Sequence, residues 1–319
     1  MKSYPLFMKP YYRHGEETPW GGSALNELFG KVLPDDKTGE SLEISALSDM
    51  ESVVENGALA GLPLSRALAE LNDTDSAFPL LVKLLDARET LSVQVHPGDE
   101  YARIHENKAG KTEAWMILAA SAGAKIIYGV KPELADNFAE MTRRGHIGLA
   151  LNMVPVRAGD VFYIPHGLVH ALCGGTAVYE IQQSSDVTYR IWDWGRLAED
   201  NKPRELHIDH ALSVSRPELA LSKIAGTTVQ VEGGVQITYI ADEHFELRKI
   251  MLSGVMPLPA GRTRLITALG MCRLRWDGGE AEFPPGKSCL IPADTEGAAL
   301  SGRAELICAM PPAPPLYKR

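Results

Sequence analysis

The sequence contains few cysteines, no long apolar stretch and no cluster of basic residues. None of the cysteines forms a CxxC pair, so the sequence indicates neither a thiolate metal site nor a dithiol redox motif. No segment approaches the roughly 18 apolar residues of a membrane-spanning helix, and the first residues lack the apolar core of a signal peptide. These absences predict a cytoplasmic protein with reduced, buried cysteines at positions Cys173, Cys272, Cys289 and Cys308.

The charge balance argues against polyanionic partners. The 319 residues include 41 acidic and 32 basic side chains, a formal net charge of −9, and no run of five or more Lys or Arg. Nucleic acids and anionic membranes are bound through clustered cations, so we expect neither as a partner. A small anionic substrate remains compatible with this balance, because a few cations in a cleft set the local potential.

The sequence does contain many short apolar runs, separated by glycine and proline, from about residue 40 onward. With 45% hydrophobic residues, the chain can form one large or two moderate cores. Runs of this length and spacing are typical of an all-β sandwich or barrel. We expect strands over residues 42–45, 78–85, 90–95, 114–118, 125–128, 161–164 and 177–182.

Helical patterns interrupt these strands in the N-terminal half. Residues 64–71 and 132–144 are expected to be helical, with Pro132 and Gly145 at positions where helices begin and end. A short third helix is expected over residues 209–214.

From about residue 216 the chain returns to short strands, and its pattern repeats an earlier one. Residues 286–292 carry the same glycine-to-proline spacing as residues 159–165, which indicates a second copy of one β unit. In that copy Gly297 stands at the position equivalent to His170, so the second unit is expected to lack metal ligands. We expect strands in it over residues 229–232, 236–240, 265–269, 272–276 and 304–310, and domains over residues 1–215 and 216–319.

Two histidines, a glutamate and a glutamine occur where strand alternation would let them meet. Gln94 and His96 lie two residues apart in an apolar, β-branched run, so their side chains leave the same face of a strand. His170 follows a turn rich in glycine and proline, and Glu113 precedes another apolar run. Imidazole, carboxylate and amide oxygen donors suit Zn²⁺, Fe²⁺, Mn²⁺ or Co²⁺. The pattern therefore predicts a metal site inside one barrel.

The other histidines of this part of the chain lie in polar, helical or turn contexts. His166 is expected to lie in a turn, where it either faces solvent or contacts the metal ligands without binding the metal itself. We expect the remaining four at the surface: His105, His146, His207 and His210.

Residues 159–170 resemble the second sequence motif of the cupin superfamily, and residues 94–113 resemble the first motif stretched by an insertion. Together with further blocks, they make the chain similar to type I mannose-6-phosphate isomerases in their short bacterial form. The resemblance implies a mostly β fold of two cupin-like jelly-roll barrels, the second degenerate and metal-free, with helical insertions in the N-terminal half. The further blocks are residues 18–22, 39–45, 80–87, 110–115 and 185–190.

This family interconverts mannose 6-phosphate and fructose 6-phosphate with one zinc ion per chain. The resemblance implies four zinc ligands, Gln94, His96, Glu113 and His170. It also implies an active-site arginine and other residues of the same pocket, which are Arg190, Lys111, Glu180 and Asp186. Ser92 and Arg196 match positions that contact phosphate in longer members of the family. The aromatic ring of Trp20 is expected to face the site.

Isomerisation through an enediolate needs a cation near the two reacting oxygens and a base close to neutral pKa beside the C1–C2 bond. Zinc and Arg190 would share the developing charge. Glu180 is our first choice of base, because it follows His170 on the next expected strand. Lys111 is an alternative, since nearby cations lower the pKa of an ammonium group, and a zinc-bound water is another. Asp186 is expected to orient Arg190.

Two other functions remain open at this stage. The first is a cupin oxygenase that uses Fe²⁺ or Mn²⁺, although Gln94, Lys111 and Arg190 favour non-oxidative chemistry on an anion. The second is a sugar-phosphate-binding cupin that has lost catalysis, although the complete set of base, cation and ligand residues argues against that loss. The sequence does not indicate an oligomeric state or a role for the C-terminal barrel.

Overall fold

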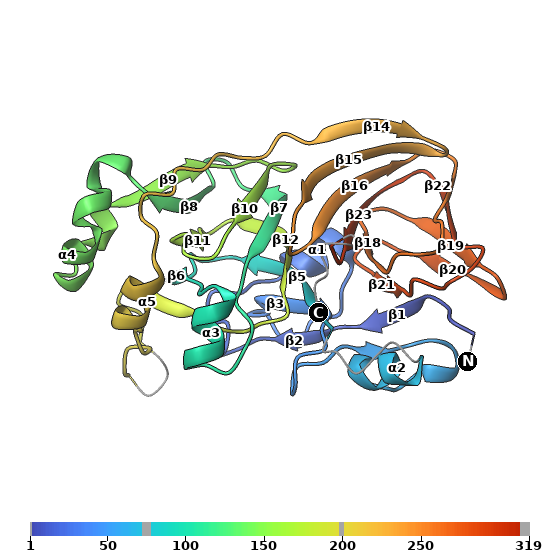
Figure 1. Ribbon diagram of the computed structural model, residues 1–319, viewed down its shortest axis with the longest axis horizontal. Coiled ribbons are helices and arrows are strands. Elements are labelled where there is room, and N and C mark those ends of the chain that lie inside the picture. The colour runs from blue at the N-terminus through green and yellow to red at the C-terminus, as the bar shows by residue number, and fades with distance from the viewer. Residues whose placement is uncertain (1, 72–77, 198–200, 313–319) are drawn as a thin grey trace.

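The computed structural model describes residues 2–71, 78–197 and 201–312, and these residues are arranged mainly as short antiparallel strands in four sheets (Figure 1). In Figure 1 most of the green and yellow segments lie on the left and most of the C-terminal third, orange to red, lies on the right, with the blue β1 (Leu6–Lys9) and α2 (Leu64–Glu70) below it. The expected mostly β class is confirmed.

Two sheets are formed by strands from the N-terminal two thirds. The six-stranded sheet has the order β10 (Val161–Ile164), β7 (Glu113–Ala120), β12 (Thr176–Gln183), β5 (Leu80–Ala87), β3 (Glu40–Ile44) and β2 (Tyr11–Arg13). The five-stranded sheet has the order β13 (Tyr189–Trp192), β6 (Val93–Val95), β11 (His170–Leu172), β8 (Lys125–Val130) and β9 (Leu151–Pro155).

The other two sheets are formed mainly by the C-terminal third. The eight-stranded sheet has the order β14 (Thr227–Val231), β15 (Gly234–Ala241), β16 (Glu246–Leu252), β23 (Ala304–Met310), β18 (Arg264–Ala268), β21 (Ser288–Ile291), β1 (Leu6–Lys9) and β4 (Val53–Val54). The four-stranded sheet has the order β17 (Val255–Pro257), β22 (Ala299–Gly302), β19 (Cys272–Trp276) and β20 (Gly279–Phe283).

The helices are short, and none in the described part of the chain is long and apolar enough to cross a bilayer. The three expected helices are present as α2 (Leu64–Glu70), as η2 (Pro132–Asn137) followed by α4 (Phe138–Arg143), and as α5 (Ile208–Val214). Two helices were not expected from the sequence, α1 (Ala24–Phe29) and α3 (Asp99–His105), and each is short and buries a single apolar residue. Two further 3₁₀ turns are η1 (Gly57–Leu59) and η3 (Ile147–Leu149).

The six-stranded sheet is covered on both faces, which explains its nearly continuous apolar strands. All eight residues of β5 are buried. Alternate β5 side chains, among them Leu80 and Val82, pack into a core with residues of the C-terminal sheet such as Leu265 and Leu290. The intervening side chains, including Lys83, face a cavity on the other side. The C-terminal part of the chain thus packs against the outer face of the sheet that lines the cavity.

The eight-stranded sheet combines both ends of the chain. Leu6 of β1 pairs with Leu290 of β21, and Met8 of β1 pairs with Val54 of β4. A domain boundary at residue 216 therefore does not separate the sheets, because β1 and β4 precede that boundary and complete the C-terminal sheet.

A buried carboxylate also joins the two parts. Glu43 of β3 lies 2.7 Å from Lys31 Nζ and accepts a 3.0 Å hydrogen bond from Ser288 Oγ of β21. Its side chain is fully buried, so these partners replace the water that a carboxylate would otherwise require. The contacts hold β3 in place against the C-terminal sheet.

The two glycine-proline segments adopt the same local structure. Gly159 and Gly286 both have positive φ, 91° and 74°, a backbone region that favours glycine. Each stands two residues before a four-residue strand, β10 or β21. The two segments thus share a glycine turn before a strand, and a second copy of the whole β unit stays a prediction.

Candidate active site

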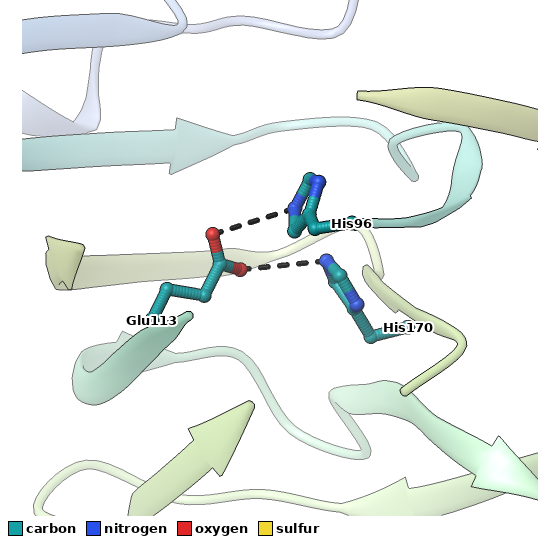
Figure 2. A group of neighbouring side chains, drawn as sticks. All are labelled: His96, Glu113 and His170. Atoms are coloured by element: carbon teal, nitrogen blue, oxygen red, sulfur yellow. Dashed lines mark ion pairs between the residues drawn. The ribbon is translucent and has the colours of Figure 1, made fainter. Parts of the chain in front are cut away.

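Three buried side chains that could hold a metal ion meet between the five- and six-stranded sheets (Figure 2). His96 directly follows β6, Glu113 is the first residue of β7, and His170 is the first residue of β11. The β6 and β11 strands pair with Gln94 opposite His170. One donor atom from each of the three residues lies within 4.8 Å of the others. Residues far apart in sequence therefore converge as the spacing predicted.

Each histidine is oriented by a backbone carbonyl. His96 Nδ1 lies 3.0 Å from the carbonyl oxygen of Val187, and His170 Nδ1 lies 2.8 Å from that of Leu168. Because a carbonyl only accepts, both Nδ1 atoms carry the proton, and both Nε2 atoms are left with a lone pair. Each Nε2 lies 3.4 Å from a carboxylate oxygen of Glu113. This is the arrangement by which proteins fix histidine ligands around a metal.

The Glu113 carboxylate is held in the ionised state. Burial alone would raise its pKa, but the charge of Lys111, whose Nζ lies 2.9 Å away, and the two histidines hold that pKa well below its usual range. Burial and the Lys111 charge lower the pKa of His96 to about 3, and burial lowers that of His170. The cluster therefore presents a carboxylate and two neutral imidazoles, the forms in which these side chains bind metals.

Both Glu113 oxygens are buried without a hydrogen-bond partner among the described residues. Such orphaned acceptors are costly unless a cation or another donor satisfies them. Ion-pair contacts reach them instead, and the Lys111 ammonium also lies 3.2 Å from His96 Nε2. Two buried carboxylate oxygens and two imidazole nitrogens in one place, with Lys111 as the neighbouring cation, form a set of acceptors that a divalent cation could also bind.

Gln94 extends the donor set. Its amide nitrogen lies 3.3 Å from His170 Nε2, and the amide oxygen and nitrogen exchange places on rotation of the amide by 180°. Such a rotation would bring the amide oxygen to the position 3.3 Å from His170 Nε2. Gln94 stays a predicted member of the ligand set.

A cavity of about 270 Å³ opens beside the cluster. Seven of the residues singled out in the sequence line it: Trp20, Ser92, Gln94, Lys111, Glu180, Asp186 and Arg190. Trp20 is buried in its wall, in agreement with the expectation that it faces the site.

A buried ionic network that includes a residue missed by the sequence analysis forms one wall. Lys83 Nζ lies 3.2 Å from Glu40 and 3.5 Å from Glu180, and Trp115 donates a 2.7 Å hydrogen bond to the other Glu180 oxygen. Burial and the charge of Glu113 raise the pKa of Glu180. Burial would raise the pKa of Glu40, but Lys83 and Arg13 outweigh it and lower that pKa to about 2. In the sequence, Lys83 could have been found only as the one lysine in the otherwise mostly apolar residues 80–87.

We expected Asp186 to orient Arg190, but in the structure main-chain groups hold Arg190. The Arg190 guanidinium donates a 2.8 Å hydrogen bond to the carbonyl of Glu205, whereas the Asp186 carboxylate accepts from Lys108 at 2.6 Å. Among the described contacts none joins Asp186 to Arg190, so Asp186 does not orient it here. Arg190 Nε is buried without a hydrogen-bond partner in the described part of the chain, which leaves it available to a ligand.

Arg204 lines the cavity, although Arg196 was the arginine expected to contact the phosphate. Arg204 lines this cavity and also a neighbouring one, whereas Arg196 lines only the neighbouring one. Asp193 binds both, accepting bonds of 2.7 and 2.8 Å from Arg204 and of 2.9 Å from Arg196. The bidentate pair fixes the Arg204 guanidinium. Arg204 lies in an irregular polar stretch, so the sequence carried no signal for it.

The remaining histidines are mostly exposed, as expected for His105, His146 and His210. His166 is half-buried beside Gly98 and does not line the cavity. His207 differs from the expectation, because it is half-buried and its Nδ1 accepts a hydrogen bond from the backbone N–H of Arg190.

The protein is similar in sequence and in fold to phosphomannose isomerases. Residues 11–116 match the family model described as phosphomannose isomerase type I, catalytic domain. The chain is 36% identical to the probable mannose-6-phosphate isomerase GmuF of Bacillus subtilis, with 97% of this chain and all of that protein covered. It is 38% identical to the mannose-6-phosphate isomerase ManA of the same organism, with 96% and 99% covered.

Solved structures agree with this relationship. A mannose 6-phosphate isomerase structure from Bacillus subtilis superposes with a TM-score of 0.89 at 32% identity, covering 96% of this chain and 99% of that one. A phosphomannose isomerase variant from Salmonella typhimurium has a TM-score of 0.77 at 15% identity, covering 97% and 100%, and shows the shared fold alone. From its full-length relatives, the chain belongs to the type I phosphomannose isomerase family.

Proposed function

We propose that this protein interconverts mannose 6-phosphate and fructose 6-phosphate through an enediolate, with one zinc ion per chain. The observation that carries the proposal is the buried His96–Glu113–His170 cluster, whose contact residue Lys111 lines an adjacent cavity together with arginines. Its relatives along the full length are named mannose-6-phosphate isomerases. The free, buried cysteines favour a cytoplasmic location.

Zinc is the metal best matched to the donors, which we propose to be Gln94, His96, Glu113 and His170. One carboxylate and neutral nitrogen and oxygen donors leave a site of net positive charge. When bound, the ion would supply a Lewis acid for the sugar oxygens, a contribution of several kcal/mol. An amide donor in place of a third imidazole favours this use over oxygen activation.

Phosphate recognition is proposed for Ser92 and Arg204. Both line the cavity, and Asp193 binds Nε and Nη2 of Arg204 and so fixes the guanidinium, which makes Nη1 the atom that would donate to a phosphate. This assignment moves the phosphate cation from Arg196 to Arg204.

We propose Glu180 as the group that moves the proton between C2 and C1. Its raised pKa makes the carboxylate a stronger base at neutral pH, and the Lys83 ammonium 3.5 Å away can stabilise its ionised form. Lys111 is already paired with Glu113, so we assign it to holding that ligand ionised. The Arg190 guanidinium would stabilise the negative charge of the enediolate.

The architecture we propose is that of two cupin-like barrels, a catalytic one within residues 1–215 and a metal-free one within residues 216–319. The repeated turn at Gly159 and Gly286 supports it, and β1 and β4 would complete the second barrel. The second barrel would serve to cover the outer face of the catalytic sheet.

The function is tested by metal analysis of the purified protein combined with a coupled assay for fructose 6-phosphate formed from mannose 6-phosphate, in air and without oxygen. We expect about one zinc per chain and equal activity under both conditions. Turnover only in the presence of oxygen would support a cupin oxygenase instead. Sugar-phosphate binding without turnover in the zinc-loaded protein would show a binding protein.

Arg204→Ala is expected to raise KM for mannose 6-phosphate by about 10- to 100-fold, because the loss of a charge-assisted contact costs roughly 1.5–3 kcal/mol. Its effect on kcat should be smaller, since the phosphate is remote from the reacting carbons. Arg196→Ala is the matched control, since Arg196 shares the Asp193 partner but lies outside the cavity. Steady-state kinetics of both variants check the assignment, and a larger KM change in Arg196→Ala would reverse it.

A further inference from the structure

His207 forms a two-point contact with the backbone of Arg190. The N–H of His207 donates to the carbonyl of Arg190 at 2.8 Å, and the N–H of Arg190 donates to His207 Nδ1 at 3.1 Å. A third bond joins the Arg190 guanidinium to the carbonyl of Glu205 at 2.8 Å. Three hydrogen bonds therefore connect Arg190 to the short segment before α5.

This contact completes the edge of a sheet. The β13 strand is the last strand of the five-stranded sheet, and Arg190 pairs with Gln94 of β6 on one side only. The register of this pair shifts between Arg190 and Trp192, so the ladder is irregular just beyond Arg190. On the open side, His207 accepts one hydrogen bond from Arg190 and donates one to it, as a residue of a neighbouring strand would. Its ring nitrogen takes the place of that residue's carbonyl oxygen.

From this geometry we propose that His207 is a positioning residue, whose neutral imidazole fixes the backbone of Arg190 and thereby aims the guanidinium into the cavity. The proposal rests on the proposed function, because the importance of Arg190 for turnover comes from it. Without His207, the backbone N–H and carbonyl of Arg190 at this sheet edge would hydrogen-bond to water, and the end of the strand could move. A displacement of about 1 Å at a charge-stabilising group is enough to slow turnover about 100-fold.

The contact requires an unprotonated Nδ1. Burial and then the positive charge of Arg190 lower the pKa of His207, with a further lowering by His210 and opposition from Glu205 and Glu106. The Tyr189 ring, 6.1 Å from the imidazole, packs on it from β13. His207 is therefore neutral at neutral pH. When the pH falls through this lowered pKa, Nδ1 becomes a donor that faces the Arg190 N–H, and the bond is lost.

Three variants at this position separate the acceptor from other roles of the side chain. Asparagine can present its amide oxygen near the position of Nδ1 and does not titrate, glutamine places its oxygen farther out, and alanine has no acceptor. We expect His207→Ala and His207→Gln to lower kcat by about 10- to 100-fold, as loss of a supporting contact does at other sites, with KM and zinc content little changed. His207→Asn should recover most of kcat and retain it to lower pH than the wild type.

His210→Ala is the matched control, because His210 lies three residues later in α5, is exposed and bonds to Tyr101. Its kcat should stay close to that of the wild type. A His207→Asn variant as slow as His207→Ala would overturn the acceptor role. A His207→Ala variant with wild-type kcat would overturn the positioning role.

A second measurement is independent of isomerase activity. Hydrogen exchange at the Arg190 amide is expected to be slow in the wild type and in His207→Asn, and faster in His207→Ala. Imidazole nitrogen shifts of His207 should show the Nδ1 lone pair at neutral pH. An inactive wild-type protein with this exchange pattern would refute the proposed function while supporting the contact. Unchanged exchange in His207→Ala would refute the contact itself.

Discussion

Replacing His170 with alanine is expected to abolish metal binding and isomerisation together. His170 is fully buried, and its Nε2 is one of the two imidazole nitrogens that face Glu113. Loss of a supporting contact behind a ligand already costs about 10- to 100-fold in metal affinity, so loss of the ligand itself should cost more. Because a bound metal contributes several kcal/mol, turnover should fall by about 10³-fold or more.

Zinc content measured after gel filtration and the coupled sugar-phosphate assay check this expectation on the same preparation. His166→Ala is the matched control, because His166 lies in the turn leading to His170 but outside the cavity. It should retain zinc and activity. Circular dichroism separates loss of the site from loss of the fold. Full zinc content in His170→Ala would remove His170 from the ligand set.

Replacing Arg190 with alanine is expected to lower kcat by about 10²- to 10³-fold and leave the zinc content unchanged. Its guanidinium reaches the cavity with a buried Nε that has no partner among the described residues. Removal of one preorganised donor to a developing oxyanion typically costs this much. The metal should remain, because the Arg190 side chain contacts neither histidine of the cluster nor Glu113 in any described hydrogen bond or ion pair.

Arg190→Lys is the informative companion variant. It keeps the positive charge but loses the planar fork, so its kcat should lie between those of the wild type and the alanine variant. Single-turnover measurements with saturating mannose 6-phosphate would separate chemistry from binding. A near-normal kcat in Arg190→Ala would show that another group stabilises the charge.

The residue types of the candidate metal cluster were predictable from local patterns, whereas the convergence of His96, Glu113 and His170 depends on strands of two sheets. Alternation along a strand places Gln94 and the residues two positions away on one face, and the turn before His170 has the glycine that its backbone requires, with φ of 84° at Gly167. Donor chemistry then limited which side chains could share a site. Secondary structure was predictable for the same reason where one strand carries its own pattern, as in the short apolar run of β10 and the alternating apolar and charged residues of β19.

The other cavity residues depend on contacts between distant segments. Lys83 was recognisable only as a charge in an apolar strand, and its partners Glu40 and Glu180 come from the two strands that flank β5. Arg204 and His207 lie in a polar stretch whose residues carry no periodic signal. Their roles follow from a return of the chain to the edge of β13, which sequence spacing does not encode.

The sequence by itself determined the β class, the repeated turn and the residue types of the candidate metal cluster, because strand period, turn chemistry and side-chain chemistry are properties of the local sequence. The tertiary structure alone decided that β1 completes the C-terminal sheet, that Arg204 rather than Arg196 lines the cavity, and that His207 supports Arg190. Those outcomes depend on hydrogen bonds and ion pairs between segments far apart in the chain. Such pairs form only where packing brings their partners together in a dry environment, where each buried polar group must find a partner.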